Sequence, residues 1–90
     1  MRETSVEKRL TNEVKKAGGI CFKVLPVIAG LPDRCVLLPV NKVYFVETKA
    51  PGGNLRPSQV ALHRKMARVG VQVTVLSSVD EVANWIKEVV

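Results

Sequence analysis

The chain has 90 residues, 47% of them apolar and 24% charged, which is typical of one folded domain over residues 1–90 and excludes an intrinsically disordered chain. Fourteen Lys and Arg against eight Asp and Glu give a net charge of +6, which favours a polyanionic partner, with nucleic acid as the first candidate. No apolar run approaches the roughly 20 residues that span a membrane, and residues 1–10 lack the apolar core of a signal peptide, so we expect a cytoplasmic protein with no membrane partner.

The first predicted element is an amphipathic helix. Thr4 and Glu7 have the spacing of a capping box, and the glycines at 18–19 end the segment. Four apolar residues recur between them at helical spacing: Val6, Leu10, Val14 and Ala17. The run ICFKVL at 20–25 then predicts a short strand, which gives way to a loop rich in proline and glycine.

Residues 34–40 and 42–49 predict two strands joined as a hairpin. Proline cannot donate to a strand ladder, so Pro39 should end the first of them or place it at an edge. A two-residue turn at 41–42 would pair Glu47 with a residue near 36 and leave Asp33 roughly 10 Å further along. A bulge or bend near Pro39, or the twist of the pair, would then be needed to bring the Asp33 carboxylate back to Glu47.

A second helix is predicted from Pro57 to about Arg68, with Gly70 as its stop. Helical phase gives it an inward face and a basic back. The inward face holds Gln59, Leu62, Met66 and Val69, and the back holds Arg64, Lys65 and Arg68. Residues 71–76 predict a fourth strand, parallel to the third because a helix connects them.

A last helix should follow a second capping-box spacing at Ser78 and Glu81, with Trp85 in the core. The resulting order is α-β-β-β-α-β-α, which is typical of a small α/β domain with a sheet flanked by helices.

The end of the third strand carries two opposite charges. Strand alternation puts Glu47 and Lys49 on one face, beside Val43 and Phe45. Desolvation there is costly unless the charges pair, hydrogen-bond or hold a metal. An ordinary ion pair at a strand end explains this spacing by itself, but Asp33 adds a second carboxylate. Two carboxylates and a lysine suit metal-assisted phosphodiester cleavage, in which hard oxygens hold Mg²⁺ and the lysine orients water or contacts phosphate.

Several quoted segments together resemble one known family. They are VEKRL, AGGICFK, GLPDRCVLLP, VYFVETKAPGG, LRPSQ and the V-G-V-x-V pattern at 69–73. Over nearly its full length the chain resembles the VRR-NUC domain, a branch of the PD-(D/E)xK nuclease superfamily. The resemblance implies a small restriction-endonuclease-like α/β fold, with an α-β-β-β-α-β core, a mixed sheet flanked by helices, and an extra C-terminal helix.

The resemblance also implies the site. Asp33 and Glu47 would bind Mg²⁺ or Mn²⁺, Thr48 would offer its carbonyl, and Lys49 would be the catalytic lysine. Gln59 looks like the family glutamine, whose inward position would let it hold Lys49 or a bound water. Capping the first turn of its own helix is the alternative role for Gln59.

The family places a glutamate of the first helix near the metal, and Glu7 matches it. Glu3 and Glu13 project closer to the centre of the apolar stripe, so the helix phase leaves the choice among the three open. The alternative role for Glu7 is capping.

Other polar residues have weaker signals. Lys23 fits the family pattern and could reach phosphate, although a plain surface lysine is the alternative. Four more basic residues could line a DNA path or form a solvated helix back: Arg56, Arg64, Lys65 and Arg68. His63 is interpreted as a core-edge side chain and is left out of the predicted site. Cys21 and Cys35 have no CxxC spacing and are expected to be small core residues.

The expected function is therefore metal-dependent DNA cleavage. Small stand-alone members of the family resemble Holliday-junction resolvases, whose symmetric dimers act on branched DNA, so a homodimer and a phage or mobile-element origin are implied. A flap, nick or single-strand nuclease is one alternative. A non-catalytic DNA-binding module is another, which the intact Asp33, Glu47 and Lys49 argue against.

Overall fold

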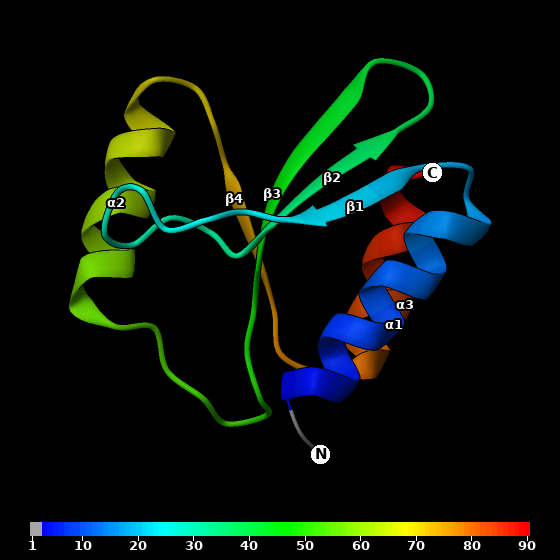
Figure 1. The fold of residues 1–90 in the computed structure, drawn as a ribbon, viewed down its shortest axis with the longest axis horizontal. Coiled ribbons are helices and arrows are strands. Elements are labelled where there is room, and N and C mark those ends of the chain that lie inside the picture. Colours follow the sequence, from blue (N-terminus) through cyan, green and yellow to red (C-terminus); the bar gives the residue numbers. More distant parts are fainter. Residues whose placement is uncertain (1–2) are drawn as a thin grey trace.

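The computed structural model describes residues 3–90, with side chains from residue 4 onward. Its elements, in chain order, are α1 (Glu3–Lys16), β1 (Ile20–Lys23), β2 (Arg34–Leu38), β3 (Lys42–Thr48), α2 (Pro57–Arg68), β4 (Val73–Leu76) and α3 (Val79–Val89). They form a small α/β domain (Figure 1). The predicted order of elements is confirmed, and the bounds of α2 are those predicted. None of the helices in this described part of the chain has the length and apolar character to cross a membrane.

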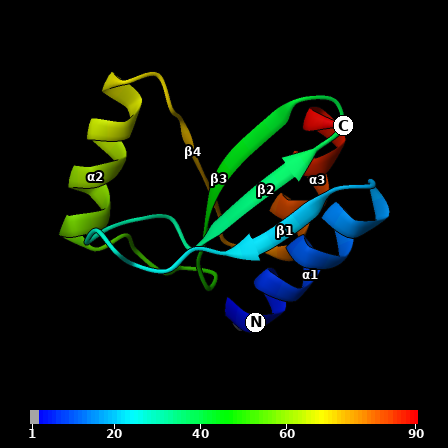
Figure 2. The ribbon, with the colours of Figure 1, turned by 45° about the horizontal axis from the view of Figure 1, so that its top comes forward.

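One mixed sheet of four strands, in the order β1-β2-β3-β4, organises the domain. The first three strands are antiparallel, and β4 runs parallel to β3, as the helical connection predicts. Helices α1 and α3 lie side by side on one face, and α2 lies apart from them on the other (Figures 1 and 2). The segment between β1 and β2 extends to α2 before it returns to the sheet (Figure 2).

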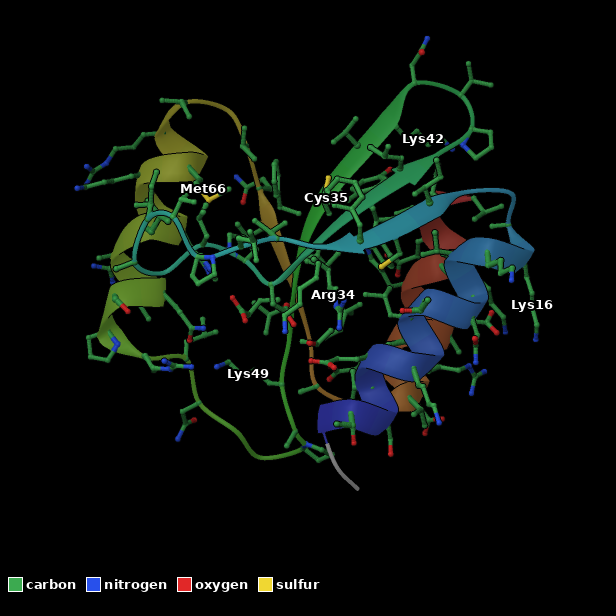
Figure 3. The ribbon with its side chains drawn as sticks, in the orientation of Figure 1. Lys16, Arg34, Cys35, Lys42, Lys49 and Met66 are labelled. Carbon is green, nitrogen blue, oxygen red and sulfur yellow. The ribbon has the colours of Figure 1, made fainter. Side chains whose placement is uncertain are left out.

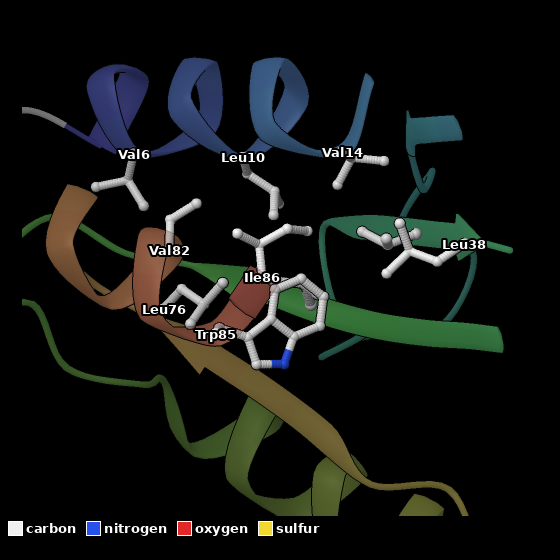
Figure 4. Packing of buried hydrophobic residues seen from close by; sticks show 10 residues of the cluster. Val6, Leu10, Val14, Leu38, Leu76, Val82, Trp85 and Ile86 are labelled. Carbon is white, nitrogen blue, oxygen red and sulfur yellow. The ribbon is translucent and has the colours of Figure 1, made fainter. Parts of the chain in front are cut away.

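The hydrophobic core lies between the sheet and the α1–α3 layer (Figure 4). Apolar side chains from both helices and from β2, β3 and β4 fill it: Val6, Leu10, Val14, Val36, Leu38, Val46, Leu76, Val82, Trp85 and Ile86. Trp85 packs edge to face on Tyr44, with ring centroids 5.3 Å apart, so its predicted core position is confirmed. Cys35 is also buried, and Cys21 packs against the core, as expected of small core residues.

Helix α2 covers its face of the sheet only in part. Gln59 is its buried residue, whereas Val69 is 79% exposed and the prediction that it faces inward is wrong. Val69 is the C-cap of α2, where the backbone leaves helical geometry, and Gly70 follows at φ +92°. The helical phase that places Gln59 therefore no longer applies to Val69.

The hairpin between β2 and β3 differs from the prediction. Its register pairs Arg34 with Val46 and Leu38 with Lys42, so the turn has three residues, 39–41, rather than two. The turn is longer because β2 ends before Pro39, which cannot donate to the ladder, and because Asn41 closes the loop at φ 58°. Continuing this register puts Asp33 level with Glu47, without the predicted 10 Å offset.

The two predicted capping boxes have different outcomes. Glu3 is already helical, so Thr4 lies inside α1 and its prediction as a cap is wrong. At α3, Ser78 is the N-cap and its hydroxyl accepts a hydrogen bond from the Glu81 N–H at 3.0 Å. The Glu81 carboxylate accepts from the N–H of Ser77 rather than from Ser78, so only half of a capping box forms there.

Candidate active site

A cleft of about 260 Å³ opens at the end of β3, between α1 and the first turn of α2. Its lining includes seven of the residues that the sequence indicated: Glu7, Lys23, Asp33, Glu47, Lys49, Arg56 and Gln59. The side chain of Lys49 extends from the end of β3 toward α2 (Figure 3). The fold therefore brings both strand carboxylates and the lysine to one cavity.

Asp33 is fixed against the backbone of β3. Its Oδ1 accepts a hydrogen bond from the Thr48 N–H at 2.8 Å, and its Oδ2 accepts one from the Thr48 hydroxyl at 2.5 Å. The Asp33 carbonyl also accepts from the Val24 N–H at 2.9 Å, which extends the pairing of β1 and β2 by one bond. Because Thr48 is fully buried, these contacts fix the carboxylate beside the end of β3.

Glu47 is the most buried acidic side chain in the described part of the chain, at 3% exposure. Its Oε1 lies 3.7 Å from Nε2 of His63 on α2. Burial lowers the pKa of His63, and the nearby Lys49 lowers it further, while a hydrogen bond to the Gly30 backbone opposes them. Glu47 therefore lies against the imidazole ring of His63, and burial is the main cause that lowers the pKa of that ring.

Gln59 joins the cleft to the start of α2. It is 7% exposed and lines the cavity, so the predicted inward face is confirmed. Its Oε1 accepts a hydrogen bond from the Arg56 N–H at 2.8 Å, which is the capping role considered as the alternative. The carbonyl oxygen thus caps α2, and the amide NH₂ group adds two donors to the same side chain.

Gly30 sets the close approach of the preceding loop to α2. A Cβ at this position would lie 2.2 Å from the carbonyl oxygen of Ser58, and φ is +94°. Only glycine tolerates both conditions without a shift of the backbone. The loop therefore packs directly on the first turn of α2, and Gly30 and Leu31 of this loop line the cleft.

The first helix contributes Glu7, whose Oε2 lies 3.2 Å from Nη2 of Arg34. Glu13 instead pairs with Arg9 at 3.4 Å and Lys16 at 3.7 Å, and it lines a different cavity. The side chain of Glu3 lies outside the described residues. Of the two candidates whose side chains the structure describes, Glu7 is the one placed at the cleft.

The predicted basic residues divide into two groups. Lys23 and Arg56 line the cleft. Arg64, Lys65 and Arg68 are exposed on α2, and none of them lines this cavity. The fold thus supports a phosphate-contacting position for the first pair more directly than for the basic back of α2.

Two residues that contact the acidic side chains of the cleft were not in the predicted site. His63 was interpreted as a core-edge side chain. It follows Gln59 by four residues and so shares the inward helix face, but the spacing does not identify Glu47 as the residue that it contacts. Arg34 follows Asp33 directly, but its pairing with Glu7 depends on how α1 packs on the sheet. No local pattern encodes that packing.

The donor set at the cleft suits a hard divalent cation. Asp33, Glu47 and Glu7 offer only oxygen ligands, and neither cysteine lines the cavity. Among the described side chains, no group of three or more His, Cys, Asp or Glu is placed so that it could hold a metal ion by itself. Mg²⁺ typically uses one or two carboxylates and takes its other ligands from water and substrate phosphate, so the residues present fit that ion.

The chain is similar to known proteins over most of its length. Residues 4–80 match the model of the VRR-NUC domain. The chain is 49% identical over 81 residues to "Putative nuclease p44" of Acyrthosiphon pisum secondary endosymbiont phage 1, covering 89% of this chain and 87% of that protein. A solved structure described as a VRR_NUC domain superposes with a TM-score of 0.86 at 29% identity, covering 94% of both chains.

The fold and these relatives define a small nuclease domain. The chain belongs to the VRR-NUC family.

Proposed function

We propose that this protein is a Mg²⁺- or Mn²⁺-dependent DNA endonuclease that hydrolyses phosphodiester bonds. The observation that carries the proposal is the convergence of Asp33, Glu47 and Lys49 on one cleft at the end of β3. A net charge of +6 supports a polyanionic substrate.

Each functional residue at the cleft has a distinct task in this reaction. Asp33, held by Thr48, and the buried Glu47 would hold the divalent ion, with Glu7 and the Thr48 carbonyl as the further ligands implied by the family. The bound ion supplies Lewis acidity and neutralises charge on the reacting phosphate. Lys49 orients the attacking water and contacts the phosphate. Gln59 positions Lys49 or that water from the first turn of α2.

We further propose that the protein acts on branched DNA as a symmetric homodimer. The sheet face that α2 leaves uncovered carries a row of apolar side chains in register, with Ile20 opposite Leu37 and Leu37 opposite Val43. Ile20 is 61% exposed, Val43 60%, and the neighbouring Phe22 46%. An apolar face of this kind supports association with a second copy, and a two-fold dimer would present two clefts to a four-way junction.

The first test is cleavage of end-labelled four-way junction, flap and linear duplex with Mn²⁺ or with EDTA. Wild type should cut the junction symmetrically with Mn²⁺, and Asp33→Ala should not cut it. A preference for flaps or nicks would support the nuclease activity and contradict the specificity for four-way junctions. Binding without cleavage of any substrate would favour a non-catalytic module and contradict the proposal.

Lys49→Ala separates catalysis from binding. Cleavage should fall below detection, while DNA affinity stays within several-fold because one phosphate contact is a small part of an electrostatic interface. An equal loss of both would make Lys49 a binding residue.

Sedimentation equilibrium tests the dimer. The wild type should sediment as a dimer, and Phe22→Asp should shift it to monomer while its far-UV circular dichroism stays unchanged. A monomeric wild type at concentrations that cut a junction symmetrically would contradict the dimer.

A further inference from the structure

A second cavity of about 410 Å³ adjoins the catalytic cleft along α1. Glu7 lines both cavities, so they meet at this residue. Each described residue that lines the second cavity has a polar side chain. We call this cavity the α1 groove, and its members include Ser5, Lys8, Thr11 and Arg34.

The α1 groove continues a line of cations that begins in the cleft. Lys49 and Lys23 line the cleft, and Arg34 and Lys8 line the groove. Lys23 pairs directly with Arg34 in the register of β1 and β2, so their Cα atoms lie about 5 Å apart. Figure 3 shows the Arg34 side chain directed to α1, on the other side of β3 from Lys49. The cationic side chains therefore form a line from the end of β3 at the cleft, across the sheet edge, to α1.

The ion pair with Glu7 makes Arg34 a rigid donor. Its side chain is 17% exposed, and Glu7 contacts it at Nη2. A guanidinium carries five N–H donors, of which Nη2 supplies two, so the pair leaves other donors of the same group in a fixed orientation. The opposite charges of Glu7 and Arg34 offset each other at the point where the two cavities meet.

We infer that the α1 groove is a phosphate-binding subsite, which holds a phosphodiester of the DNA beside the one in the cleft. Lys8 supplies the net positive charge of the groove, because the charge of Arg34 is offset by Glu7. Arg34 adds the N–H donors that Glu7 does not use, and Ser5 adds a hydroxyl donor. The Thr11 hydroxyl instead donates to the Glu7 carbonyl at 3.0 Å. Cations and hydroxyls are the groups that contact DNA backbone phosphates, and such contacts fix the register of a strand. This subsite rests on the proposed function, since it would set where the strand enters the cleft.

Lys8→Gln is the direct test, and Lys15→Gln is its matched control. Both lysines are exposed on α1, and the two positions lie seven residues apart on nearly the same side of the helix, but Lys15 does not line the groove. Binding of a fluorescent DNA duplex is measured by anisotropy in EDTA at several salt concentrations. Lys8→Gln should reduce the slope of log affinity against log salt by about 1, and Lys15→Gln should leave it unchanged.

Arg34 gives a second readout. Arg34→Gln should weaken binding several-fold, and Arg34→Lys should restore part of it because it keeps the charge and loses only the fork geometry. Lys8→Gln keeps the inference testable if Arg34→Gln fails to fold, since Lys8 makes no ion pair among the described residues.

The outcomes separate the subsite from the function. If the wild type binds and cuts DNA but Lys8→Gln and Lys15→Gln give equal slopes of log affinity against log salt, the subsite alone is overturned. A wild type that neither binds nor cuts DNA would overturn both. The subsite would be supported if only Lys8→Gln reduced the slope of log affinity against log salt and if Arg34→Lys bound DNA more tightly than Arg34→Gln.

Discussion

Replacing Thr48 by valine removes one hydroxyl from the site and keeps the shape of the side chain. Thr48 is fully buried, and its hydroxyl donates to the Asp33 carboxylate at 2.5 Å. A hydrogen bond to a charged group contributes about 1.5–3 kcal/mol. The added methyl group recovers about 0.8 kcal/mol by burial, so Thr48→Val should lower the free energy of unfolding by about 1–2 kcal/mol.

Urea unfolding followed by the fluorescence of Trp85 measures this loss, because Trp85 is the only tryptophan and lies in the core. In a domain of this size, 1–2 kcal/mol corresponds to a fall in Tm of roughly 5–15 °C. The matched control is Thr74→Val on β4, a strand threonine with no side-chain hydrogen bond among the described residues. Thr74→Val should change the free energy of unfolding by no more than about 0.5 kcal/mol.

Double mutants identify the partner of the hydroxyl. In a protein that already carries Asp33→Asn, Thr48→Val should lower the free energy of unfolding by less than it does in the wild type, because the charge that strengthens the hydrogen bond is gone. The reasoning would be refuted if Thr48→Val lowered the free energy of unfolding equally with and without Asp33→Asn. It would also be refuted if Thr48→Val destabilised the protein no more than Thr74→Val does.

Three further changes test other parts of the site. Asp33→Asn should remove the rise in Tm that Mn²⁺ gives the wild type, since that rise comes from metal binding to the folded state, and an unchanged rise would place the ion elsewhere. Gly30→Ala should destabilise the protein much more than Gly52→Ala, because both glycines have positive φ but only Gly30 has backbone within 2.2 Å of an added Cβ; equal losses in urea unfolding would contradict this. Burial raises the pKa of the Cys21 and Cys35 thiols, so at pH 8 their thiolate fractions are small and a disulfide reagent should modify them far more slowly in the folded protein than in urea; equal rates would contradict their burial.

The order of elements could be predicted because its signals are local. The apolar spacing of α1, the proline at the start of α2 and the glycine after it all act within a few residues. The parallel pairing of β3 and β4 also follows from the helix between them. These features need no knowledge of how the layers pack.

Contacts between layers were not predictable in the same way. Nothing in the first helix indicates that Glu7 meets Arg34, because that distance depends on the packing of α1 against the sheet. The contact of His63 with Glu47 depends likewise on how far α2 lies along β3. Helix phase gave the correct face for Gln59 and the wrong one for Val69, because α2 ends at Arg68 and the phase does not extend to the C-cap residue.

The turn between β2 and β3 decides whether the site forms at all. Paired residues on neighbouring strands point to the same face, so a register shifted by three would pair Glu47 with Val36 and put the carboxylate on the core side. Residues 35–38 are apolar at every position, so β2 does not reveal which of its faces is buried. The three-residue turn at 39–41 settles the choice, placing Val36 opposite Tyr44 over the core and Asp33 level with Glu47 at the cleft. The geometry of the carboxylate pair thus follows from Pro39 and Asn41, which take no part in the chemistry.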